Sequence, residues 1–286
     1  MRKKKRPNGF FLTTMGVFLL LVAAFLAVPL LSLIRFSLTA PGGGATIGNY
    51  LEVFSKKLYQ VSFLNSVKLS LLSSALGLLI ALVCSHAVTR FGGEKTQRNL
   101  LVVINMTSNF AGIPLAFALT LMLGNTGMFM TLAEAMGFDL SGHFNVYSVQ
   151  GLVVAYTYFQ VPLGIMLLYP VYRGIRPDWK EAASILGAGS CQFWARVGIP
   201  VILPSILSTF TLLFANAMGA YATAYYIVSS SYNIVPIRIS ALVSGDVRTK
   251  PELGSALAVS LAFVLIVAML LNDWASRVGS RRGIKS

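Results

Sequence analysis

Residues 63–88 read FLNSVKLSLLSSALGLLIALVCSHAV, a stretch of 26 residues that holds one lysine and no acidic residue. An α-helix rises about 1.5 Å per residue, so such a stretch is long enough to cross a hydrocarbon layer about 30 Å thick. Five further stretches have the same character, and together the six cover residues 10–34, 63–88, 100–123, 149–172, 201–228 and 253–271. The sequence therefore predicts an all-α integral membrane protein with six transmembrane helices in a single domain over residues 1–286.

The first stretch follows a basic cluster at residues 2–6, an arrangement that also opens secretory signal peptides. Its apolar part is about 25 residues long, whereas the apolar region of a signal peptide has roughly 7–15 residues. We therefore expect an uncleaved first helix.

Composition excludes several classes of protein. Hydrophobic residues make up 56% of the chain and charged residues 11%, and the mean hydropathy is +0.73. The net charge is +14, but the basic residues lie between long apolar runs rather than in a stripe among polar ones. A soluble enzyme and a nucleic-acid partner are therefore excluded. Two cysteines exclude a disulfide framework, and no group of Cys and His has metal-ligand spacing, so no metal site is expected.

The distribution of Lys and Arg predicts the orientation. Of the 23 basic residues, 16 lie in the N-terminal segment, the second and fourth connections and the C-terminal tail. Six lie in the other connections, and Lys68 lies inside the second stretch. Because cytoplasmic loops carry the excess of basic residues, both termini are expected in the cytoplasm.

The chain lacks the motifs of nucleotide hydrolysis and of common hydrolytic sites. It contains no G-x-x-x-x-G-K-[ST], no H-E-x-x-H and no G-x-S-x-G, so no catalytic residue is assigned. All nine acidic residues fall in connections or at helix ends. An ion-coupled carrier usually keeps ionisable groups at membrane depth, and here Lys68 is alone. If the chain moves a solute uphill, the energy would therefore come from elsewhere.

The fourth connection contains RPDWKEAASILG at residues 176–187, which predicts a short helix over residues 178–187. Pro177 and Asp178 mark its start, and Asp178 with Glu181 has the spacing of a capping box. Gly187 marks its end. An apolar face is formed at helical spacing by Trp179, Ala182, Ala183 and Leu186. Such a helix either lies at the lipid interface or docks in the cleft of a partner, and physical reasoning leaves both open.

The pattern over residues 181–200 resembles the EAA loop of ABC-importer permeases, E-A-A-x3-G-x9-I-x-L-P. Glu181-Ala182-Ala183 is followed after three residues by Gly187, and after nine more by Val197-Gly198-Ile199-Pro200. Val and Ile replace the usual Ile and Leu. The chain is similar to the permeases of polyamine, sulfate/molybdate, ferric-iron and aminophosphonate importers.

This resemblance implies the type I importer permease fold in a bacterial inner membrane, with 178–187 as the cytoplasmic coupling helix. The chain would be a pore subunit and not an enzyme, without a cofactor of its own. Two cytoplasmic ATPase subunits would bind ATP and Mg²⁺, beside a second permease subunit (homologous or identical), an extracytoplasmic solute-binding protein and membrane lipid. The substrate would be a small polar solute such as a polyamine or an aminophosphonate. The residues implied in ATPase coupling are Asp178, Glu181, Ala182, Ala183, Gly187 and Pro200.

Polar residues inside the third, fourth and fifth stretches suggest a path for the solute. Hydrocarbon offers no hydrogen-bond partner, so polar side chains at this depth face protein or water. Each alone also fits a bond between helices, but as a set they predict the translocation path. The tyrosines of the fifth stretch suit an organic cation, although tyrosine is also enriched at membrane interfaces. The residues are Asn105, Asn109, Tyr156, Gln160, Asn216, Tyr221 and Tyr225.

Two other functions remain open from the sequence. An ion-coupled secondary transporter would transport alone in liposomes, and collapse of the ion gradient would abolish that transport. A membrane scaffold without transport would tolerate leucine on the polar faces of the third to fifth stretches.

Overall fold

The computed structural model describes residues 9–138, 144–229, 231–244 and 249–283, with side chains for residues 13–138, 144–229, 231–244 and 249–274. These residues form helices, with no β-strand among them beyond an isolated bridge between Thr39 and Ala45. The segments long and apolar enough to cross a membrane are Thr13–Ser37, Lys57–Arg90, Ile113–Ala135, Val149–Arg173, Ser190–Gly219 and Pro251–Trp274. The prediction of an all-α chain with six transmembrane helices is confirmed.

The chain divides into two compact units, residues 1–57 with 239–261 and residues 58–238 with 262–286. The first unit contains α1 (Gly9–Ser37) and α2 (Gly48–Ser55), and the divisions fall within α12 (Val235–Ser244) and α13 (Pro251–Gly283). Asn49 is buried and closes the loop between α1 and α2, because its amide donates to the carbonyls of Ser37 (3.0 Å) and Thr39 (2.9 Å). The described α1 side chains are mostly exposed, as expected for a helix in contact with lipid.

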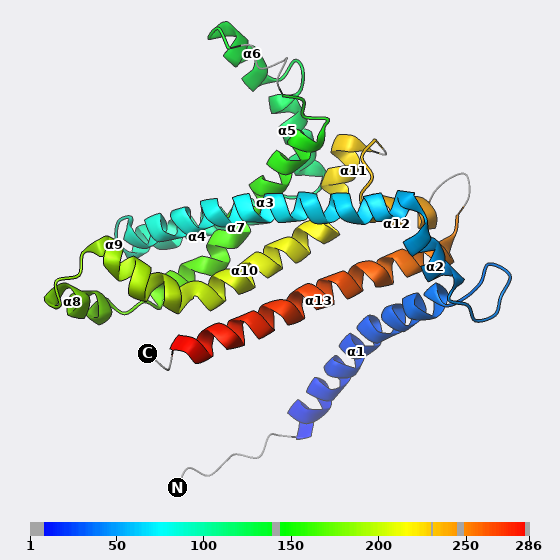
Figure 1. Cartoon of the computed structure of the whole chain (residues 1–286), viewed down its shortest axis with the longest axis horizontal. Helices are drawn as coiled ribbons and strands as arrows, with labels where there is room; N and C mark the ends of the chain where they lie inside the picture. The colour runs from blue at the N-terminus through cyan, green and yellow to red at the C-terminus, as the bar shows by residue number, and fades with distance from the viewer. Residues whose placement is uncertain (1–8, 139–143, 230, 245–248, 284–286) are drawn as a thin grey trace. The chain divides into compact units, whose positions relative to one another are not determined.

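The second unit is a bundle centred on α7 (Figure 1). Just over half of the apolar stretch of α7 is buried (56%), the largest share among the six candidate spans. Its buried residues join two apolar clusters, one with α5 and α11 and one with α3 and α10. The helices of this unit are α3 (Lys57–Arg90), α4 (Glu94–Ser108), α5 (Ile113–Leu123), α6 (Met128–Ala135), α7 (Val149–Arg173), α8 (Pro177–Ile185), α9 (Ser190–Phe193), the π-helix η1 (Trp194–Gly198), α10 (Ile199–Gly219) and α11 (Ala222–Val228).

A face of small residues brings α3 close to α7. Serines, glycine and alanine recur at helical spacing and are buried at Ser66, Ser70, Ser73, Ser74, Gly77 and Ala81. A Cβ at Gly77 would lie 2.9 Å from the Cβ of Gln160, and a Cβ at Gly164 would lie 2.7 Å from the Cβ of Ala81. Helices in lipid associate through such close backbone approach, since apolar burial adds little between them.

Two of the stretches predicted as continuous spans are interrupted. The stretch 100–123 is divided between α4 and α5, and residues 109–112 form the first break. Pro114 lacks an N–H for the helix ladder, and Gly112 has φ 74° and ψ −144°, a conformation that side chains other than glycine rarely adopt. The candidate span here is Ile113–Ala135. The stretch 201–228 is divided between α10 and α11, and residues 220–221 form the second break.

Candidate functional site

The short helix α8 begins at Pro177 and ends at Ile185, within two residues of the predicted bounds. The capping box predicted for Asp178 and Glu181 is not formed. Proline occupies the first helical position, where its fixed φ suits the helix, so Asp178 lies inside the helix rather than at its cap. The N-cap is Arg176, without a side-chain cap bond, and its guanidinium donates to Asp178 Oδ2 at 2.6 Å.

Gly187 ends this helix through its backbone conformation, with φ +79°. Its N–H donates to the carbonyl of Ser184 at 3.0 Å, and the N–H of Ala188 donates to the carbonyl of Ala183 at 2.9 Å. This pair of bonds is the Schellman motif, which needs a left-handed residue at the position of Gly187. The helix end predicted from Gly187 therefore has a defined geometric cause.

No residue of α8 is buried, although the helix carries apolar side chains. Ile185 and Leu186 are 86% and 87% exposed, and Glu181 and Ala182 are exposed beside them. Exposed apolar residues on a short helix indicate a surface that another molecule covers. Pro200, the last of the predicted coupling residues, lies apart from this surface as the second residue of α10.

An aromatic cluster anchors the segment that follows α8. The Trp194 ring lies 5.0 Å from the His86 ring and 5.9 Å from the Tyr172 ring, which join it to the ends of α3 and α7. A Cβ at Gly198 would lie 2.4 Å from Trp194 Cε3, so glycine leaves room for the indole. Neither this anchor nor the π-helix was predicted from the sequence. Pro200 was the available signal for the π-helix, because proline has no N–H to donate to a carbonyl of the preceding turn.

Two predicted path residues, Tyr156 and Gln160, are buried inside the second unit. The Gln160 side chain is fully buried, donates to Ser73 Oγ and accepts from Ser74 Oγ, each at 2.9 Å. The Tyr156 hydroxyl donates to the carbonyl of Ala220 at 2.6 Å. Both side chains therefore join α7 to neighbouring segments and are shielded from solvent in this conformation.

The first break contacts the start of α11, directly after the second break. Thr223 Oγ1 donates to the carbonyl of Gly112 at 3.2 Å, and a Cβ at Gly112 would lie 3.7 Å from the Cβ of Ala222. At the second break, the carbonyl of Ala220 accepts a hydrogen bond from the Tyr156 hydroxyl. Irregular backbone at membrane depth is stable where protein groups or enclosed water satisfy it. The sequence showed polar residues in these segments but carried no signal that the first break contacts α11.

The remaining predicted path residues are less buried. Asn105, Asn109 and Asn216 are exposed, and the Asn109 amide donates to the carbonyl of Asn105 at 2.9 Å. Tyr225 is 51% exposed, and its ring stacks on that of Tyr221 at 5.3 Å. Exposed amides on a membrane-embedded bundle need water or another protein chain as their neighbour.

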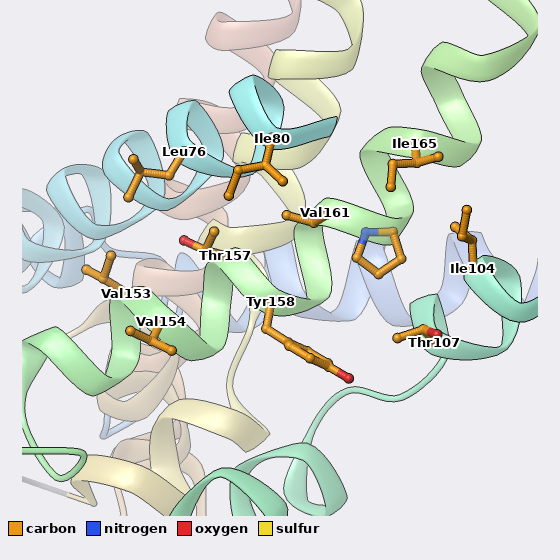
Figure 2. Close-up of a pocket in the computed structure, with 11 residues that line it drawn as sticks. Leu76, Ile80, Ile104, Thr107, Val153, Val154, Thr157, Tyr158, Val161 and Ile165 are labelled. Atoms are coloured by element: carbon orange, nitrogen blue, oxygen red, sulfur yellow. The ribbon is translucent and has the colours of Figure 1, made fainter. Parts of the chain in front are cut away.

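An apolar cavity of about 570 Å³ lies between α3, α4 and α7. Figure 2 shows Thr157 and Tyr158 among aliphatic side chains, with Ile104 and Thr107 across the cavity. Thr157 Oγ1 is buried and has no hydrogen-bond partner in the part of the chain that the structure describes. This lining gives a polar solute few partners, so the cavity is not a candidate for the path.

Comparison with known proteins gives a consistent family. Residues 73–282, more than half of the chain, match the family described as "Binding-protein-dependent transport system inner membrane component". The probable sulfate transport system permease protein of Helicosporidium sp. subsp. Simulium jonesii is 21% identical over 88% of this chain and 90% of the relative. The spermidine/putrescine transport system permease protein of Haemophilus influenzae is 22% identical over 91% of this chain and 95% of the relative.

The fold matches that of a solved transporter. A chain of the bacterial alginate ABC transporter, solved in complex with an alginate pentasaccharide-bound periplasmic protein, aligns with a TM-score of 0.74. The alignment covers 94% of each chain at 15% identity. The type I importer permease fold implied by the sequence resemblance is confirmed. The chain therefore belongs to the family of binding-protein-dependent transport system inner membrane components, as a multi-pass permease subunit of an ABC importer.

Proposed function

We propose that α8 couples this permease to a separate ATPase subunit. The observation that carries the proposal is the exposure of α8, a helix with both ends defined and with Ile185 and Leu186 uncovered. Glu181 would provide a charged contact, Ala182 and Ala183 a close approach, and Gly187 the helix end. Closure of two ATPases around ATP and Mg²⁺ would then move the permease.

The proposed assembly has two ATPases, a second permease subunit, identical or homologous, and an extracytoplasmic solute-binding protein. The solved alginate transporter, which has a periplasmic protein bound, supports the last of these partners. The excess of Lys and Arg in the connection that contains α8 supports a cytoplasmic position for α8 and for both termini.

The proposed translocation path of the solute runs alongside the two helix breaks at residues 109–112 and 220–221. Asn105 and Asn216 are exposed polar side chains on the helices that lead to the breaks, Asn109 is exposed in the first break, and Tyr225 is exposed on α11. A second permease subunit facing these side chains would enclose a wet passage, which accounts for amides that lipid cannot satisfy.

The proposed solute carries a protonated amine, as polyamines and aminophosphonates do. The stacked Tyr221 and Tyr225 present aromatic faces, which attract organic cations. The relatives include a spermidine/putrescine permease and a sulfate permease. This contrast makes sulfate the informative comparison solute.

Reconstitution into proteoliposomes with the ATPase and the solute-binding protein produced by the same cells tests the proposal. Labelled spermidine, 2-aminoethylphosphonate and sulfate are offered in turn, with ATP or with a non-hydrolysable analogue inside. We expect uptake of an amine solute that requires ATP hydrolysis and persists when ion gradients are collapsed. Uptake of sulfate alone would contradict the amine proposal, and uptake without the ATPase would contradict the coupling proposal.

A further inference from the structure

A second cavity, of about 480 Å³, lies beside the base of α8. Its walls come from the ends of α3 and α7, the start of α8 and the junction of α9 with η1. Figure 1 shows these elements gathered at one end of the second unit. Neither the proposed coupling surface nor the proposed path uses this cavity.

The cavity is strongly cationic. Its lining includes the four basic side chains of Arg90, Arg173, Arg176 and Lys180. None of its lining residues in the described part of the chain is acidic. All four basic side chains are exposed at the cavity, and together they create a positive potential there that favours an anion.

Two of these cations are already paired and two are not. Arg176 donates to Asp178 at 2.6 Å, and Arg173 donates to Glu94 at 3.3 Å. Across the described side chains, Arg90 and Lys180 have no carboxylate within 4.0 Å. One guanidinium and one ammonium therefore remain available for an anionic ligand.

The position of the cavity indicates which anion it meets. It lies at the ends of two candidate spans, Lys57–Arg90 and Val149–Arg173. Tyr172 and Trp194 form part of its wall with rings 5.9 Å apart. Tyrosine and tryptophan concentrate at the level of lipid headgroups, and basic pockets at that level favour phosphate-bearing lipids.

We propose that this cavity binds a phosphate ester, supplied by the headgroup of an anionic phospholipid in the adjoining leaflet. Arg90 and Lys180 contact the phosphate oxygens through charge-assisted hydrogen bonds. The aromatic wall covers the glycerol end of the headgroup. Because Lys180 lies in α8, the bound lipid braces the base of that helix against the ends of α3 and α7. The proposal needs neither the coupling role of α8 nor its orientation.

Native mass spectrometry of the purified full-length chain in detergent tests the proposal. Phosphatidylglycerol and phosphatidylcholine are titrated in turn. The double variant Arg90→Gln/Lys180→Gln removes both available cations. The matched control Lys95→Gln/Arg98→Gln removes one lysine and one arginine from α4, neither of which lines the cavity. The double variant Arg90→Lys/Lys180→Arg retains both charges.

We expect the wild type to retain phosphatidylglycerol and to release phosphatidylcholine. Affinity for phosphatidylglycerol falls about thirtyfold in Arg90→Gln/Lys180→Gln, as loss of two cations near a membrane surface predicts. It is preserved in the control and in the charge-retaining variant. Equal retention of the two lipids, or unchanged affinity in Arg90→Gln/Lys180→Gln, would overturn the proposal.

Competition by soluble glycerol 3-phosphate distinguishes the source of the phosphate ester. Failure of glycerol 3-phosphate to displace phosphatidylglycerol supports the lipid. Binding of glycerol 3-phosphate without binding of phosphatidylglycerol overturns the lipid source. An anionic side chain of a protein partner would satisfy the same cations, and the chain purified alone would then bind neither ester, which also overturns the proposal.

Discussion

Gly187 and Gly189 both have open space where a Cβ would be added, yet their backbones differ. Gly187 has φ +79°, whereas Gly189 has φ −71°. Gly187→Ala is expected to weaken the end of α8 by about 1–2 kcal/mol, because a side chain disfavours the left-handed conformation. In hydrogen exchange, the amides at positions 187 and 188 should exchange about tenfold faster.

Gly189→Ala is the matched control and should leave those exchange rates unchanged. Equal exchange in the two variants would show that the left-handed conformation at position 187 does not hold the end of α8.

Gln160 offers a second test at this scale, because it bridges α3 and α7 through Ser73 and Ser74. Gln160→Leu should lower the free energy of unfolding in detergent by about 1 kcal/mol, the usual size of a bond between membrane helices. Gln150→Leu, on the exposed first turn of α7, should change it by less than about 0.5 kcal/mol. Transport lost without a change in stability would instead assign Gln160 a direct contact with the solute.

The sequence identified polar residues at membrane depth but did not separate bridging residues from exposed ones. Gln160 and Asn216 both stand in apolar stretches, and only the first has a serine pair facing it on another helix. Membrane helices are apolar on every side, so hydrophobic periodicity carries little information about which face meets protein. That distinction depends on contacts between residues far apart in the chain.

At the scale of elements, α8 was predictable because proline, glycine and acidic residues mark helix ends locally. The predicted capping box of Asp178 and Glu181 was wrong, because the helix already begins at Pro177, one residue before Asp178. The breaks were harder to predict. Pro114 indicated a disturbance in the third stretch, but no proline marks residues 220–221, where Tyr156 from α7 satisfies the carbonyl of Ala220.

Charge reversal on α8 tests the coupling proposal at this scale. Glu181→Lys should leave the chain inserted and folded while it lowers ATP-driven transport about tenfold or more, because an opposite charge at a docking contact is costly. Glu134→Lys, the same reversal at an exposed residue of α6, is the control and should transport as the wild type does. Wild-type transport by Glu181→Lys with the ATPase bound would show that α8 does not couple the two subunits.

For the whole molecule, orientation in the membrane is testable with a native cysteine. Cys191 is exposed in α9, within the connection proposed to face the cytoplasm, and Cys84 is partly buried in α3. A membrane-impermeant maleimide should label Cys191 in inverted vesicles and leave it unlabelled in right-side-out vesicles. The labelling is done in the Cys84→Ser variant, in which Cys191 is the one remaining cysteine.

Glu134→Cys in a background without the native cysteines provides the reciprocal control, with labelling in right-side-out vesicles. The reverse pattern at both positions would invert the orientation that the basic residues predict.

The contact between the first break and the start of α11 couples the energetics of the two interrupted helices. Thr223→Val removes the bond to the Gly112 carbonyl, and Gly112→Ala strains the backbone that presents this carbonyl. Effects of substitutions at independent sites add, whereas directly contacting sites commonly show interaction energies of about 0.5–3 kcal/mol. In a double-mutant cycle measured by unfolding in detergent, these two changes should deviate from additivity by more than about 0.5 kcal/mol. A ligand that rearranges one interrupted helix would therefore also change the free energy of the other. The two helices would then respond together to a ligand bound at either one.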